Sequence, residues 1–92
     1  MNKSERSGTV AAEAGRWLRQ FRVDAGLTGT SAGKMMHTSS SRIGQIENGH
    51  SMPTTRVILD LLWIYDVSEG DAVAFFAALL KEDSRSRLSH PA

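Results

Sequence analysis

Several kinds of residue are rare or missing in this chain of 92 residues, which has no cysteine and only two prolines. Without cysteine it can form no disulfide, thiolate nucleophile or cysteine-based metal site. The longest apolar stretch, residues 57–65, is interrupted by Asp60 and is too short to cross a bilayer. The N-terminus lacks the apolar core of a signal peptide, so we expect a cytoplasmic protein that does not contact the membrane.

The pattern also argues against an enzyme. The three histidines, His37, His50 and His90, are not at the i, i+4 spacing of a helical metal site. No glycine-rich loop follows a strand pattern, so the sequence offers no phosphate-binding motif of that kind. We therefore expect no catalytic residue, no metal and no cofactor, and each histidine is interpreted as an exposed polar residue.

Charge is uneven along the chain, although the net charge is only +1. Residues 1–50 carry seven Lys/Arg against four Asp/Glu, which gives +3, whereas residues 51–92 carry four against six, which gives −2. The first half is the side that would face an anion. A chance scatter of charges is the alternative interpretation.

Apolar residues recur at spacings of three and four, without the alternation of half-buried strands, so the sequence predicts an all-α fold. We expect a compact bundle of five helices in one domain at 11–83. The terminal segments 1–10 and 84–92 are expected to be disordered tails, because they are polar and poor in apolar residues. The predicted helices are 11–25, 29–36, 40–47, 55–65 and 69–83.

Turn and capping residues support these boundaries. Gly26 is expected to end the first helix in the left-handed conformation, and Asn48-Gly49 to end the third. Thr28 is placed to cap the second helix, Thr38 and Ser39 the third, and Ser68-x-x-Asp71 resembles a capping box for the fifth. The residues expected to face the core include Ala14, Leu18, Phe21, Ala25, Met35 or Met36, Ile43, Ile46, Val57, Ile58, Leu61, Leu62, Ile64, Ala72, Phe75, Phe76, Leu79 and Leu80.

Residues 27–49, LTGTSAGKMMHTSSSRIGQIENG, hold the most informative pattern. Two short helices that cross at a steep angle need a small residue at their contact, which Ala32-Gly33 supplies. At fixed offsets, this segment resembles the helix-turn-helix of phage-repressor and Cro-type (XRE) regulators. The residues that carry the resemblance are Leu27-Thr28, Gly33, His37, Ser39 and Ile43-Gly44-Gln45-Ile46-Glu47-Asn48-Gly49.

The resemblance implies a lambda-repressor-like bundle, in which the second and third helices form a helix-turn-helix at 28–47 and the third enters the major groove of DNA. It also implies that Ser40, Ser41, Arg42 and Gln45 contact the bases. Arginine can pair bidentately with guanine and glutamine with adenine, whereas serine accepts several partners. The alternative is that all four are solvated residues of a surface helix.

The resemblance assigns the remaining polar residues as well. Phosphate contacts would come from Thr28, Lys34, Ser39 and Asn48, together with the amide ends of the second and third helices. Arg22 stands where the family has a partner for the Glu of the Ile-Glu-Asn-Gly motif, here Glu47, so we expect a structural ion pair. A phosphate contact is the alternative role of Arg22.

Some positions depart from the family pattern. Gly29 stands where a phosphate-binding Gln is common, and His50 where a Lys or Arg is common. The segment Leu61 to Asp71 resembles a narrower group, actinobacterial transcriptional regulators in which such a domain usually precedes a larger effector domain. The chain would then be a fragment of such a regulator or a stand-alone version of it.

Two functions remain open at this point. The first is a sequence-specific transcriptional regulator that binds double-stranded DNA as a homodimer, with Trp63, Phe75 and Phe76 as candidate dimer contacts. Packing in the core is the alternative for each of these aromatic residues. The second function is a protein-interaction module, an adaptor or antitoxin-like partner, with weak or no DNA binding.

Overall fold

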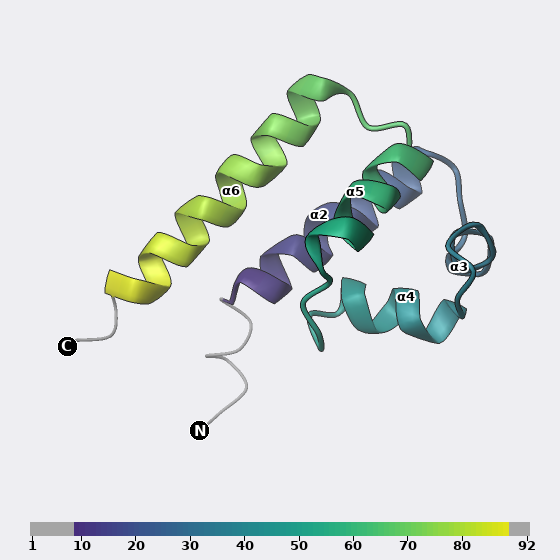
Figure 1. Cartoon of the computed structure of the whole chain (residues 1–92), viewed down its shortest axis with the longest axis horizontal. Coiled ribbons are helices and arrows are strands. Elements are labelled where there is room, and N and C mark those ends of the chain that lie inside the picture. The colour runs from purple at the N-terminus through teal and green to yellow at the C-terminus, as the bar shows by residue number, and fades with distance from the viewer. Residues whose placement is uncertain (1–8, 89–92) are drawn as a thin grey trace.

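The computed structural model describes residues 9–88, and the side chains of residues 9–85. No strand occurs in this part of the chain, which confirms the predicted all-α fold. The five helices are α2 (Val10–Asp24), α3 (Gly29–Met35), α4 (Ser40–Glu47), α5 (Thr55–Ile64) and α6 (Glu69–Leu88) (Figure 1).

The inner boundaries of the two predicted tails are corrected by the structure. The side chain of Thr9 accepts a hydrogen bond from the amide of Ala12, so α2 already begins at Val10. The last helix continues beyond Asp83 to Leu88, because no glycine or proline interrupts the chain after Gly70 in this stretch. The other residues of the predicted tails lie outside the described part of the chain.

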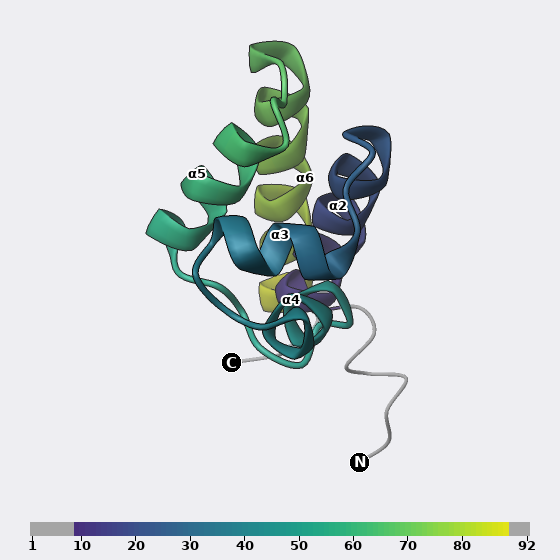
Figure 2. The ribbon, with the colours of Figure 1, turned by 90° about the vertical axis from the view of Figure 1, so that its right-hand side faces the viewer.

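Helix α2 is the centre of the bundle and contacts α4, α5 and α6. Helix α6 lies along it, as both views show (Figure 1 and Figure 2). The rings of Trp17, Phe21 and Phe75 all contact one another, with centroid distances of 5.8 to 5.9 Å, and the ring of Phe76 lies 5.0 Å from that of Phe75. The buried core is Ala14, Leu18, Phe21, Ala32, Ile43, Ile46, Ile58, Leu61, Leu62, Tyr65, Phe75 and Leu79.

Some of the expected core residues lie elsewhere. Ala25 is exposed, because it is the residue that caps the C-terminus of α2. Leu80 is 69% exposed, since α6 is covered on one side only and Leu80 lies outside the contact with α2. Met36 packs against the core and Met35 does not.

The three aromatic candidates for dimer contacts have different environments. Phe75 is fully buried between the rings of Trp17 and Phe21, so it cannot contact a second copy. Phe76 is half-buried and packs against the same core. The Trp63 side chain on α5 is 85% exposed, which leaves it as the accessible member of the set.

Candidate nucleic-acid interface

Helices α3 and α4 cross steeply, with α4 seen lengthwise in Figure 1 and end-on in Figure 2. Gly33 is buried at the turn between them, where a Cβ atom would lie 2.9 Å from the carbonyl carbon of Ser39. The amide of Thr38 donates to the carbonyl oxygen of Gly33 at 2.7 Å. The predicted need for a small residue at this contact is confirmed, because any side chain at residue 33 would push the backbones apart.

A second close approach, between α2 and α4, was not anticipated from the sequence. A Cβ atom on Gly15 would lie 2.4 Å from the carbonyl oxygen of Glu47 and 2.6 Å from that of Ile46. Gly15 therefore lets the C-terminal end of α4 rest directly on α2. The available signal was a glycine next to Ala14 on the apolar face of a predicted helix, where glycine is otherwise unfavourable.

The predicted ion pair between Arg22 and Glu47 lies beside this contact. The Nε atom of Arg22 donates to Oε2 of Glu47 at 2.7 Å and Nη2 donates to Oε1 at 3.0 Å, so the pair is bidentate. Nη1 donates to the carbonyl oxygen of Leu27 at 2.8 Å. Because only 14% of the Arg22 side chain and 7% of the Glu47 side chain are exposed, this arrangement favours the structural role of Arg22 over phosphate binding.

The charges of the pair also act on the pKa of Tyr65, which is the only tyrosine of the chain. The hydrogen bond from Arg22 to Glu47 raises the pKa of the guanidinium, although its burial acts in the opposite direction. Burial, and then the nearby charge of Glu47, raise the pKa of Tyr65 to about 12. The inner side of the helix-turn-helix is therefore a low-polarity contact that contains one matched pair of charges.

The outward face of α4 consists of Ser41, Gly44, Gln45 and Asn48, which follow one another at spacings of three and four. The three side chains among them are exposed, whereas Ile43 and Ile46 on the opposite side are buried. A Cβ atom on Gly44 would meet nothing within 4 Å. This face is polar, carries no carboxylate and is open to a large partner.

The four predicted base-contact residues are not on one face. Ser41 and Gln45 belong to the outward face, whereas Ser40 lies on the side of α3, with its Cβ 4.0 Å from the position that a Cβ of Gly29 would take. Arg42 lies on the side of α5 and is half-buried beside Val57. Its Nη1 atom donates to the hydroxyl oxygen of Ser51 at 3.0 Å. The inward spacing of Ile43 and Ile46 predicts that Arg42 lies outside the core, but its side chain is half-buried, and Ser51 is a neighbour that the sequence did not indicate.

The predicted phosphate-contact residues lie on α3, just before it, and at the two ends of α4. Thr28 and Ser39 are N-caps, and their hydroxyl oxygens accept from the amides of Ser31 and Arg42 at 3.0 and 3.1 Å. The N-cap of α4 is Ser39, and Thr38 precedes it without that role. The two remaining candidates, Lys34 on α3 and Asn48 at the C-cap of α4, are exposed.

Residues 9–88 also show what this part of the chain lacks. This part of the chain contains no group of three or more His, Asp or Glu side chains that could hold a metal ion. None of its helices is both long enough and apolar enough to span a bilayer.

Comparison with curated proteins and with solved structures finds no match. Among protein families, residues 13–75 match the model described as a helix-turn-helix domain. The matched range is more than half of the chain, and it contains the contact at Gly15, the crossing at Gly33 and the whole of α4. The chain therefore belongs to this family of helix-turn-helix domains.

Proposed function

We propose that this protein is a sequence-specific, DNA-binding transcriptional regulator of the phage-repressor and Cro type, which reads the major groove with α4. The observation that carries the proposal is the outward face of α4, where polar side chains are exposed on a helix whose other side is fixed in the core. A helix held in this way fits the dimensions of the major groove of B-DNA.

Specificity is assigned to Gln45 and Arg42, with Ser40 and Ser41 as short-range contacts. Gln45 lies on the outward face, where its amide can pair with the edge of adenine. Arg42 approaches from the side of α5, and its bond to Ser51 uses Nη1, so the other N–H groups of the guanidinium are those that would reach guanine.

Phosphate contacts are assigned to Thr28, Lys34, Ser39 and Asn48, which lie around the reading helix. Lys34 supplies a positive charge on α3, and its side chain is exposed. The hydroxyls of Thr28 and Ser39 already accept a backbone amide, and that of Thr28 also donates to Oγ of Ser31 at 3.1 Å. The O–H of Ser39 can donate to a phosphate oxygen directly, whereas that of Thr28 would first turn away from Ser31. Contacts of this kind position the protein, whereas base contacts give it specificity.

The regulator is proposed to act as a homodimer in which α5 contributes to the contact. Leu59 and Trp63 are one helical turn apart on α5, and their side chains are 50% and 85% exposed. An exposed tryptophan next to an exposed leucine is typical of surfaces that associate. Two copies would place two α4 helices on a two-fold operator.

The test is a titration of duplex DNA at several salt concentrations, preceded by selection of bound sequences from random DNA. We expect affinity to fall steeply as salt rises, with a slope of about one unit for each phosphate contact, and a clear preference for the selected sequence. Gln45→Ala and Arg42→Ala should relax that preference, whereas Lys34→Ala should weaken binding to all sequences alike. Equal affinity for every duplex would contradict the proposal.

A protein-interaction module is the second candidate function. The exposed Trp63 favours it. Gly29 favours it as well, because this residue, on the side of α3 that approaches Ser40, has no side chain that could bind a phosphate. This candidate predicts little DNA binding at moderate salt and a stable complex with another protein, so the same titration separates the two.

A further inference from the structure

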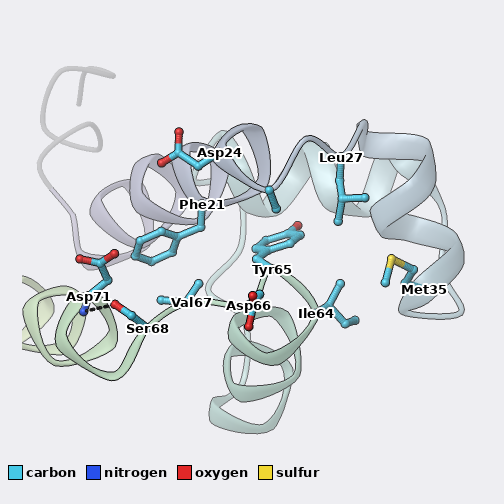
Figure 3. Close-up of a pocket in the computed structure, with 11 residues that line it drawn as sticks. Phe21, Asp24, Leu27, Met35, Ile64, Tyr65, Asp66, Val67, Ser68 and Asp71 are labelled. Carbon is cyan, nitrogen blue, oxygen red and sulfur yellow. Dashed lines mark hydrogen bonds between the residues drawn. The ribbon is translucent and has the colours of Figure 1, made fainter.

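A groove lies at the end of the molecule where α2 and α5 finish and α6 begins (Figure 3). Its volume is about 440 Å³, and it opens to solvent. Figure 3 shows Phe21 and Asp24 from α2, Met35 from α3 and Asp71 from α6 around the turn that holds Tyr65 and Asp66. We call this the acidic groove, and its lining is Phe21, Asp24, Ala25, Leu27, Met35, Ile64, Tyr65, Asp66, Val67, Ser68 and Asp71.

The charges of the acidic groove have a single sign. Asp24, Asp66 and Asp71 line it, and no Lys, Arg or His does. Within the described part of the chain none of these three carboxylates takes part in an ion pair. The C-terminal ends of α2 and α5 add partial negative charge here, whereas the N-terminal end of α6 adds partial positive charge, so the three carboxylates decide the sign of the groove. The groove is therefore complementary to a cation and repels the phosphates of nucleic acid.

The interior of the groove is apolar. Phe21 and Tyr65 are buried in its wall, and Leu27, Ile64 and Val67 are half-buried. Met35 is 49% exposed at its edge, and its flexible thioether suits adaptable contacts with a partner. A hydrated inorganic cation would leave this apolar surface uncovered, so the occupant that uses the whole groove carries both positive charge and apolar side chains.

We propose that the acidic groove docks a basic, amphipathic segment of a partner protein. Its Lys or Arg side chains would lie against Asp24, Asp66 and Asp71, and an apolar side chain would cover Leu27 and Val67. This inference goes beyond the proposed function, because the groove is at the C-terminal end of α2, whereas α4 contacts α2 near Gly15. The partner would therefore leave the outward face of α4 open, although the groove adjoins the proposed phosphate contacts Thr28 and Lys34 through Leu27 and Met35.

A second copy of this chain is a poorer occupant, because the cations that it leaves unengaged among the described side chains, Arg19, Lys34 and Lys81, lie on three different helices and not in one basic segment. Five of the six arginines whose side chains the structure describes bond to a side chain of the same copy. These bonds are Arg16 with Glu13, Arg22 with Glu47, Arg42 with Ser51, Arg56 with Asp60 and Arg85 with Glu82.

The test uses the full chain, labelled with nitrogen-15, and a synthetic peptide of alternating Arg and Leu as the probe. We expect amide shifts to concentrate at Leu27, Met35 and Val67 and to leave α4 unchanged. The double variant Asp24→Asn with Asp66→Asn should bind the peptide about fivefold more weakly, because two of the three charges that attract its cations are lost. Asn suits residue 66, whose φ of +55° lies in the left-handed region.

The matched control removes two carboxylates outside the groove, in Asp60→Asn with Glu69→Gln, and should bind the peptide as the wild type does. A peptide of alternating Glu and Leu should not bind. The proposal would be overturned if both double variants bound the peptide equally weakly, or if the amide shifts spread over other surfaces. It would also be overturned if raising the protein concentration alone produced shifts at the groove, because a second copy would then be the occupant. If the double variant of Asp24 and Asp66 does not fold, two other results decide the question. The amide shifts of the wild type should map to the groove, and Met35→Gln should weaken peptide binding without changing the charge.

Discussion

The inner and outer sides of the helix-turn-helix use glycine in opposite ways. On the inner side, a Cβ on Gly15 or Gly33 would lie within 2.9 Å of the backbone of another segment. On the outer side, a Cβ on Gly44 would meet nothing within 4 Å, and one on Gly29 would only reach ordinary contact distance with Ser40. Packing explains the first pair of glycines and not the second. The inner side is therefore fixed by the fold, while the outer side is available for a partner.

Gly15→Ala should produce the largest effect, because it forces α4 away from α2 at a backbone contact that cannot yield. We expect a loss of about 3 kcal/mol or more in the free energy of unfolding, or failure to fold. Urea unfolding followed by tryptophan fluorescence measures it. A loss below about 0.5 kcal/mol would mean that the two helices are not held at this distance.

Glu47→Gln tests the charged part of the inner side. The variant leaves the guanidinium of Arg22 largely buried without its opposite charge, so we expect a loss of about 3 kcal/mol in unfolding free energy. Glu69→Gln, which neutralises an exposed carboxylate at the start of α6, is the control and should change stability little. Equal stability of the two variants would show that the Arg22 pair contributes nothing.

Tyr65 makes the low polarity of the inner side measurable. Its pKa of about 12 in the folded protein lies above the usual 10.0. Because the folded state resists ionisation, the free energy of unfolding is unaffected by Tyr65 below pH 10 and falls as pH rises from 10 through 12, by about 3 kcal/mol in total. Absorbance of the phenolate reports this residue alone, since the chain has one tyrosine. A midpoint near 10 without urea would contradict the buried environment, and Tyr65→Phe should remove the pH dependence.

Gly44→Ala should raise the free energy of unfolding, whereas Gly15→Ala should lower it. The added methyl group meets no protein atom, and alanine favours the helix, so the free energy of unfolding should rise by up to about 1 kcal/mol. On the proposed reading face the same methyl group would hold α4 away from the base edges, so affinity for the selected duplex should fall severalfold. Higher stability with unchanged affinity would place Gly44 outside the DNA contact.

Ser51→Ala should have the smallest effect and concerns the orientation of Arg42. Losing the hydrogen bond at 3.0 Å leaves the guanidinium less restrained, so preference for the selected base should fall a few-fold, with a change in stability of about 1 kcal/mol or less. Ser51→Thr keeps the hydroxyl and should restore the preference. In a protein that already carries Arg42→Ala, adding Ser51→Ala should not change the base preference further. If it lowers the preference as much as it does in the wild type, Ser51 does not act through Arg42.

Features set by local chemistry were predictable from the sequence. Gly26 has the left-handed φ of +75° that ends a helix, and Thr28 and Ser39 cap α3 and α4 as expected. The ion pair of Arg22 and Glu47 was also anticipated, because a family pattern carries information about residues distant in sequence. Four of the five helices end within one residue of their predicted ends.

Features set by tertiary contact were not predictable in this way. The requirement at Gly15 depends on where α4 lies, and the bond of Arg42 depends on the loop that brings Ser51 back to it. Periodicity placed Leu80 on a broad apolar face of α6, but it could not show which edge of that face would be left uncovered. For the same reason it could not distinguish the buried Phe75 from the exposed Trp63.

The position of Trp63 gives the protein an internal optical reporter. The chain has two tryptophans, and the other, Trp17, packs against Phe21 and Phe75 and donates to Glu13 at 2.9 Å. Emission from Trp17 will therefore follow unfolding, while quenching of Trp63 by a dissolved collisional agent will follow the accessibility of α5. Association of two copies could then be recorded in unlabelled protein, as protection of one fluorophore while the other stays constant.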